Sequence, residues 1–251
     1  MTAIRAIFHN WLVFYLLIVL SWSAILVMGL AESFSGEFIA MQIVIEICSN
    51  SVLSLNIYGL FIMWFLMSIA MMAPTIIPSL ITYQDLLNTG ARKKNSFWTF
   101  VLGFMSIWFF FSLIGSIGQK LLAKSYFLDE SGAFLSSTVS AVFLLVAGLY
   151  QLSPLKEACL TKCRSPFTFF LQNWKEGVVG SFSMGLKLGI FCLGCCWALM
   201  SLAFVGGTMN LVFMVLMTLF MILEKLPNFG KYITKPLSFF LIASATVLVW
   251  L

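Results

Sequence analysis

Residues 178–203 read VVGSFSMGLKLGIFCLGCCWALMSLA, a run that contains a single charged side chain, Lys187. An apolar run of about 20 residues is long enough to cross the hydrocarbon core of a bilayer as a helix. This run therefore predicts a transmembrane helix, and similar runs recur along the rest of the chain.

The composition extends this conclusion to the whole protein. Of the 251 residues, 61% are hydrophobic and only 9% are charged, and the mean hydropathy is +1.05. Soluble domains carry roughly 25% charged residues. The excess of apolar residues is too large for one buried core, so we expect most of the surface to face lipid. The net charge of +5 does not point to nucleic acid as a partner.

The predicted fold class is all-α, a polytopic transmembrane helix bundle that forms one domain over residues 1–251. Seven apolar stretches are long enough to span, at Trp11–Leu30, Leu55–Ile77, Phe97–Ile117, Phe134–Leu152, Val178–Ala203, Thr208–Leu223 and Pro236–Leu251. The first of these has a small-residue sequence after it that resembles a signal-peptide cleavage site. Its apolar core is longer than the about 7–15 residues of a signal peptide, so we expect a retained helix.

Two features of the chain shape these spans. Pro74 and Pro78 should kink or end the second span, because proline removes a helical hydrogen-bond donor. Gly206-Gly207 is the only break between the fifth and sixth spans, which predicts a tight helical hairpin.

The distribution of Lys and Arg predicts a cytoplasmic N-terminus. With that orientation only Lys120 and Lys124 lie in outside segments, and Lys187 lies within a span. The other basic residues fall in inside segments: Arg5, Arg92, Lys93, Lys94, Lys156, Lys162, Arg164, Lys175, Lys225, Lys231 and Lys235. This asymmetry follows the positive-inside rule.

Three of the six cysteines occur together in the fifth span, as Cys192-Leu-Gly-Cys195-Cys196. Positions i, i+3 and i+4 share a face of a helix, so these thiols should converge, about 21–27 Å from the cytoplasmic start of the helix. Met184 flanks them. Thiolates and thioethers are soft ligands that select Cu(I) or Zn. The alternative is that the cysteines are small apolar packing residues.

A second pair, Cys159 and Cys163, is spaced i, i+4 in a segment predicted to be cytoplasmic, with Lys156 and Arg164 nearby to favour thiolate. A surface amphipathic turn with incidental cysteines explains the pair equally well. The sixth cysteine, Cys48, falls in the segment between the first two spans.

Other side chains give weaker signals. Methionines recur at helical spacing in the second and sixth spans, a pattern that is more often core or lipid contact than a metal path. Lys187 is a charge deep in a span, without an acidic partner in another span, so its partner could come from another subunit. The single histidine, His9, makes a histidine-ligated site within the membrane improbable.

Several segments resemble a prokaryotic family of polytopic proteins described as predicted metal-binding integral membrane proteins. The matching segments, which run in the family's order, are Ala70-Met-Met-Ala-Pro74, Tyr150-Gln-Leu-Ser-Pro-Leu-Lys156, Ala158-Cys-Leu-Thr-Lys-Cys-Arg-Ser-Pro166, Cys192-Leu-Gly-Cys-Cys-Trp-Ala-Leu-Met200, Gly207-Thr-Met-Asn210 and Glu224-Lys225. The resemblance implies a prokaryotic plasma (inner) membrane location.

One departure from the family pattern bears on the metal. Where the family has Gly-x-Arg-His-Gly, this chain has Gly185-Leu-Lys-Leu-Gly189, so Leu188 replaces a histidine one turn before Cys192. If that histidine is a ligand in the family, a site made of sulfur alone and suited to Cu(I) remains, or the site is vestigial.

Three functional hypotheses follow. The first is copper handling or delivery to a membrane metalloenzyme, with Cys192, Cys195, Cys196, Cys159, Cys163 and Met184 as metal ligands. The second is a non-catalytic accessory or scaffold subunit of a larger membrane complex. The third and weakest is a thiol-redox enzyme that uses Cys192 and Cys195, which an apolar setting disfavours.

Overall fold

The computed structural model describes residues 2–31, 56–89, 96–129, 131–208, 210–226 and 230–250, and within these ranges the protein is all-helical. The helices are α1 (Thr2–Ala31), α3 (Ile57–Thr89), α4 (Ser96–Lys124), α5 (Ser137–Gln151), α6 (Pro154–Arg164), α7 (Pro166–Asn173), α8 (Gly177–Ser201), α9 (Ala203–Gly206), α10 (Leu211–Lys225) and α11 (Gly230–Trp250). The predicted all-α class is confirmed. Cys48 lies outside the described residues.

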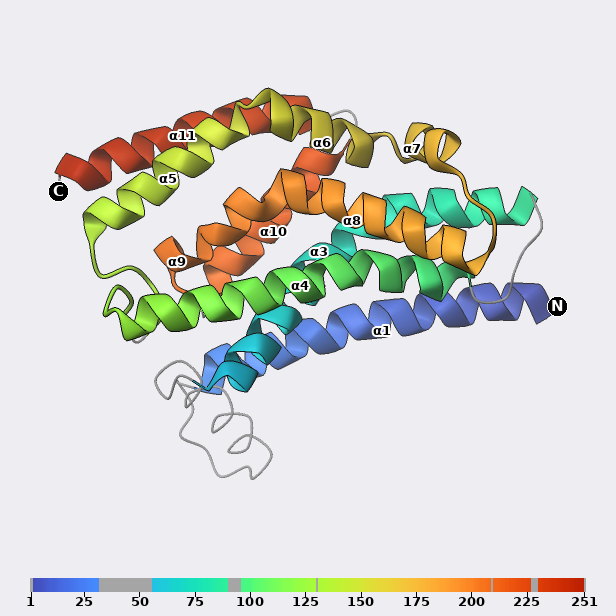
Figure 1. Ribbon diagram of the computed structural model, residues 1–251, viewed down its shortest axis with the longest axis horizontal. Helices are drawn as coiled ribbons and strands as arrows, with labels where there is room; N and C mark the ends of the chain where they lie inside the picture. The colour runs from blue at the N-terminus through green and yellow to red at the C-terminus, as the bar shows by residue number, and fades with distance from the viewer. Residues whose placement is uncertain are drawn as a thin grey trace.

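The long helices lie roughly along one axis of the molecule, with the two chain termini at opposite ends (Figure 1). The helices α1, α3, α4 and α8 form one side, and α5 pairs with α11 on the other. The helix α10 packs against α3, α6 and α8, so its C-terminal end lies in the interior.

Five of the described helical segments are long and apolar enough to cross a membrane, or six if the bent pair α5–α6 counts as one span. The axes of α5 and α6 differ by 62°. Two of the predicted spans correspond to α5 and α10, which have 15 residues each and reach only about 22 Å. The prediction of seven spans is therefore not confirmed, and the cytoplasmic N-terminus stays a prediction.

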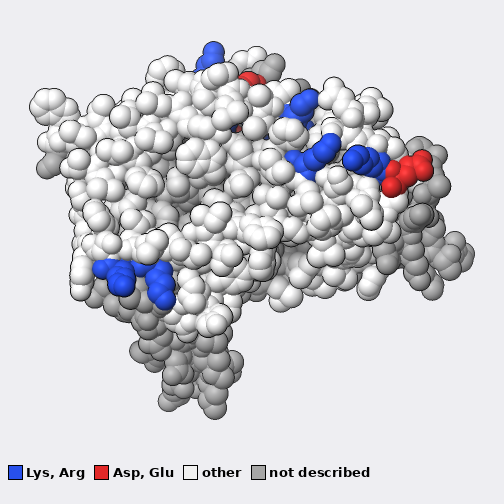
Figure 2. Space-filling view, in the orientation of Figure 1, with Lys and Arg blue, Asp and Glu red and all other residues white. Residues whose placement is uncertain are grey.

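Figure 2 shows how little charge one face of the molecule carries. Its Lys, Arg, Asp and Glu side chains gather in a few places near the ends and the upper edge, and the surface between them is uncharged. This is the kind of surface that the low charged fraction predicts.

The helix boundaries follow from local sequence. The Ser153 hydroxyl caps α6 by accepting from the Lys156 backbone N–H, and Pro154 occupies the first helical position, where its missing N–H has no cost. The Asn210 side chain caps α10 in the same way. Of the two effects predicted for Pro74 and Pro78, an end of the helix does not occur, because α3 continues through both prolines to Thr89; a kink stays a prediction.

The closest helix contact is between α4 and α8, and it depends on glycine. A Cβ atom at Gly185 would lie 2.1 Å from the Phe100 carbonyl oxygen, and one at Gly103 would lie 2.3 Å from the Phe182 carbonyl oxygen. The Tyr83 hydroxyl of α3 lies 2.7 Å from the Ser181 hydroxyl of α8. The small residues on this face of α8 therefore admit a neighbouring helix, as membrane helices commonly do.

Candidate metal centre

The three cysteines of α8 lie together in the protein interior. Cys192, Cys195 and Cys196 are each at most 2% exposed. The Cys195 and Cys196 sulfur atoms are 3.3 Å apart, and the Cys195 thiol donates to the Cys192 carbonyl oxygen at 3.1 Å. The prediction that these residues share one face of the helix is confirmed.

A fourth thiol comes from α6. Cys163 lies close enough to Cys195 for the two thiols to interact, and α6 packs against α8. We call Cys163, Cys192, Cys195 and Cys196 the thiol cluster. Cys159 lies one turn before Cys163 and packs against α8, where a Cβ at Gly194 would lie 2.7 Å from its sulfur.

Lys225, at the end of α10, points its ammonium group into the thiol cluster. Its Nζ lies 3.0 Å from the Cys192 sulfur and 2.7 Å from the Thr75 hydroxyl of α3. The side chain is buried, with 8% of its surface exposed. It also interacts electrostatically with the other three cysteines of the cluster. The centre is thus formed by four helices, α3, α6, α8 and α10.

A second buried charge lies immediately before Lys225 on α10. Both carboxylate oxygens of Glu224 accept from the Lys156 ammonium of α6, at 2.8 and 2.9 Å. Arg164 donates to the Glu224 backbone carbonyl at 2.8 Å and to the Glu157 carboxylate at 2.9 Å. These contacts fix α6 against α10 and therefore fix the position of Cys163.

This arrangement corrects two expectations about the cysteines. The sequence suggested separate thiol groups near the two membrane faces, whereas Cys163 belongs to the same cluster as the α8 thiols. The charge expected to stabilise thiolate on Cys159 and Cys163 was that of Lys156 and Arg164. Lys156 instead pairs with Glu224, and Arg164 pairs with Glu157. The cation next to the sulfur atoms is Lys225.

The remaining sequence candidates lie elsewhere on α8. Met184 is buried but precedes Cys192 by eight residues, about 12 Å along the helix. Lys187 donates to the Asn173 side-chain oxygen at 3.0 Å, so its partner is within the chain and the expectation of a partner from another subunit is not supported. Leu188 is buried at 2% exposure and supplies no ligand in the histidine position.

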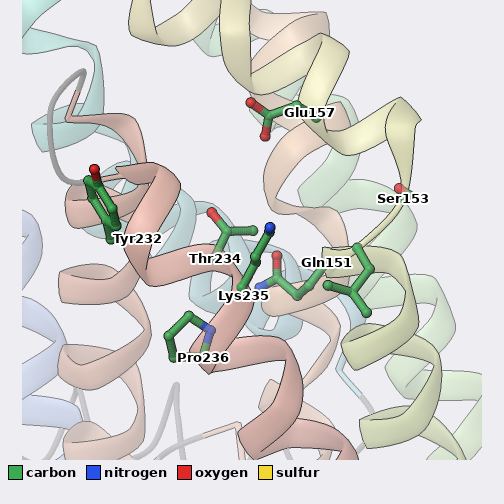
Figure 3. A pocket seen from close by; sticks show the side chains of 8 residues that line it. Gln151, Ser153, Glu157, Tyr232, Thr234, Lys235 and Pro236 are labelled. Atoms are coloured by element: carbon green, nitrogen blue, oxygen red, sulfur yellow. The ribbon is translucent and has the colours of Figure 1, made fainter.

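A separate cavity of about 760 Å³ lies where α5 bends into α6 and faces the start of α11. Figure 3 shows Gln151 of α5 lying opposite Thr234 and Lys235 of α11, with Glu157 on the next helix. The lining contains no sulfur atom, so the cavity is not the metal centre. It adjoins the centre's polar network, because Arg164 also lies 3.3 Å from the Thr234 hydroxyl.

The chemistry of the centre is that of sulfur. The five cysteines within the described ranges are free thiols. In those same ranges, no three His, Cys, Asp or Glu side chains are already arranged around a position for a metal ion. Metal binding by the thiol cluster would therefore require side-chain rotation.

The residues that sequence reasoning missed are Lys225 and Thr75. The family resemblance could have pointed to both residues. Lys225 belongs to the matching segment Glu224-Lys225, and Thr75 directly follows the matching segment Ala70–Pro74. The orientation argument instead placed Lys225 among the basic residues of an inside segment. Its contact with Cys192, 33 positions away, depends on how α10 packs against α8.

The fold and the site define an all-helical protein that buries a group of soft thiol ligands beside a lysine. Over residues 61–248 the chain matches the family PpoB2, described as a copper chaperone. This match covers most of the chain, and the protein belongs to that family. No curated protein and no solved structure matches it.

Proposed function

We propose that this protein is a membrane-embedded copper chaperone that holds Cu(I) in the thiol cluster and passes it to a partner metalloenzyme. Membership of a copper chaperone family supports a non-catalytic, metal-handling role. The long apolar helices support an integral membrane location, which we propose to be the prokaryotic plasma membrane.

The observation that carries the proposal is the environment of Lys225. Of the buried charges around it, Glu224 is neutralised by Lys156, and Arg164 is paired with Glu157. Among the described residues, Lys225 donates to a neutral hydroxyl and to the Cys192 sulfur. A buried ammonium is stabilised by a nearby negative charge, and thiolate or a copper–thiolate complex at Cys192 would supply that charge.

A copper–thiolate complex has the required charge. Cu(I) bound by two thiolates carries one negative charge, which a single ammonium neutralises. With a metal–sulfur distance of about 2.3 Å, the value for zinc–thiolate sites, trigonal coordination by two thiolates and one protonated thiol places the sulfur atoms about 4 Å apart. The Cys195 and Cys196 sulfurs at 3.3 Å need to move apart by less than 1 Å. Rotation of their side chains would therefore bring these two thiols to the ion.

The donor arrangement favours Cu(I) over Zn. Three of the four thiols come from adjacent turns of α8 and lie on one side of the helix. Such a set suits two- or three-coordinate Cu(I) better than the tetrahedral coordination that Zn adopts. The replacement of histidine by Leu188 leaves soft donors alone, which also favours Cu(I).

The two alternatives receive less support. The accessory-subunit hypothesis relied in part on an unpaired Lys187, and that side chain binds Asn173 within the chain. A thiol-redox enzyme needs an accessible thiol, whereas Cys192 and Cys195 are nearly fully buried.

The test is the metal content of protein purified anaerobically in detergent and measured by mass spectrometry, with co-purifying chains identified from the same sample. We expect about one copper per chain in the wild type and none in the triple variant Cys192→Ser, Cys195→Ser, Cys196→Ser. The matched control is Cys159→Ser, which removes a thiol outside the cluster and should keep the copper. Stoichiometric copper in the triple variant would refute the proposal, and a metal-free wild type with fixed partner chains would favour the accessory subunit.

A further inference from the structure

Two lines of methionine run through the protein interior. Met63, Met67 and Met71 recur every fourth residue on α3, and Met214, Met217 and Met221 follow one face of α10. All six are buried, with exposed fractions of at most 7%. We call them the methionine stripes. Their burial shows that these side chains are not lipid contacts, which leaves core packing or a role in metal handling.

Both stripes lead to the thiol cluster. Thr75 follows Met71 by four residues on α3, and Lys225 follows Met221 by four residues on α10. These two end points are in contact, since the Lys225 ammonium lies 2.7 Å from the Thr75 hydroxyl and 3.0 Å from the Cys192 sulfur. The helices pack against each other and run in the same direction along the molecule (Figure 1). Each stripe therefore ends one turn before the centre.

We propose that the methionine stripes form a route along which Cu(I) reaches the thiol cluster through the interior, from the ends of α3 and α10 that lie farthest from it. This inference rests on the proposed function for the identity of the ion and its destination. Copper remains Cu(I) throughout, and each step exchanges one neutral thioether ligand for the next, without electron or proton transfer.

The chemistry of thioether suits such a route. It is a soft ligand that selects Cu(I), and it is neutral, so it fills a dry interior without the cost of burying a charge. Successive methionines of the α3 stripe are about 6 Å apart along the helix axis, a distance that flexible side chains can bridge. Thiolate at the end of the route binds more strongly than thioether, which gives the movement its direction.

The first test is the rate at which the protein takes up Cu(I). Wild type and the variant Met67→Leu, Met71→Leu, Met217→Leu, Met221→Leu are placed in lipid nanodiscs and mixed anaerobically with a chromophoric Cu(I) chelate. Leucine conserves volume and should preserve the core. We expect the variant to load at least tenfold more slowly and to reach the same final stoichiometry. The matched control Met105→Leu, in α4, should load like the wild type.

Equal loading rates in the wild type and the stripe variant would overturn the route while leaving the thiol site intact. A second measurement separates the two proposals if the thiols fail to bind copper. A chain with all six cysteines replaced by serine is titrated with Cu(I) and studied by X-ray absorption. We expect thioether-coordinated Cu(I) that disappears when the six stripe methionines become leucine. Its absence from the cysteine-free chain would also overturn the route.

Discussion

Replacing Lys225 by methionine tests the electrostatic basis of the metal centre. The ammonium group is buried and lies 3.0 Å from the Cys192 sulfur. Methionine has a similar volume and no charge, so the variant retains packing but loses the cation that compensates bound copper–thiolate. Removal of one partner from a buried ion pair costs about 3–5 kcal/mol. At about 1.4 kcal/mol per factor of ten, we expect Cu(I) affinity to fall by at least about 100-fold.

The free protein should respond in the opposite direction. A buried ammonium is costly to desolvate, and in the metal-free variant Cys192 can take up a proton, so that no unpaired charge is left buried. We therefore expect the Lys225→Met protein without metal to unfold at the same temperature as the wild type or higher. Loss of affinity together with retained stability separates an electrostatic role from a structural one.

The assay is anaerobic competition for Cu(I) with a chromophoric chelator, on wild type and variant in the same detergent. The matched control is Lys187→Met, which makes the same substitution on α8 at a lysine that binds Asn173. It should leave the affinity within about threefold, since its ammonium is not part of the thiol cluster. Wild-type affinity in Lys225→Met would refute the reasoning, as would an equal loss in Lys187→Met.

Two further predictions concern stability, measured as the free energy of unfolding in mixed micelles. Gly185→Ala should lower this free energy by about 1–3 kcal/mol, because the new methyl group would overlap the neighbouring backbone of α4. The control is Gly118→Ala, where a Cβ meets nothing within 4 Å. Equal effects of the two substitutions would contradict the packing argument. Gln151→Met should raise it by about 1 kcal/mol, because both amide atoms of Gln151 are buried without a hydrogen-bond partner among the described residues. The control Gln119→Met should lower the free energy of unfolding, because Gln119 accepts a hydrogen bond from Trp64 at 2.6 Å. A destabilised Gln151→Met would contradict the prediction by showing that the Gln151 amide has a partner.

The sequence was sufficient for the features that depend on composition and local spacing. The all-α class follows from long apolar runs, and the shared face of the α8 cysteines follows from their i, i+3, i+4 spacing. The four-residue spacing of Gly185 and Gly189 likewise explains why α4 can approach α8 closely.

The features that were missed depend on packing between distant segments. The bend between α5 and α6 places the half-buried Cys163 against α8. Counting apolar residues identifies α6 only as a polar segment. The orientation argument counted Lys156 and Lys225 among the basic residues of inside segments, and both are buried. Charge alone could not separate a buried lysine from an exposed one, because the distinction lies in partners that are far away in the sequence.

The adjacent residues Glu224 and Lys225 explain why the centre exists as a unit. Neighbouring positions on a helix point in directions about 100° apart, so Glu224 can bind α6 through Lys156 while Lys225 reaches α8 through Cys192. Under the proposed function, copper bound to Cys192 would replace the contact between Lys225 and Cys192 and would leave the contact between Glu224 and Lys156 in place. The helix that supplies Cys163 thus stays fixed while the ammonium adjusts to the charge of the metal–thiolate group. A chaperone must both hold and release its ion, and this division lets the charge at the cluster change without loss of the fold around it.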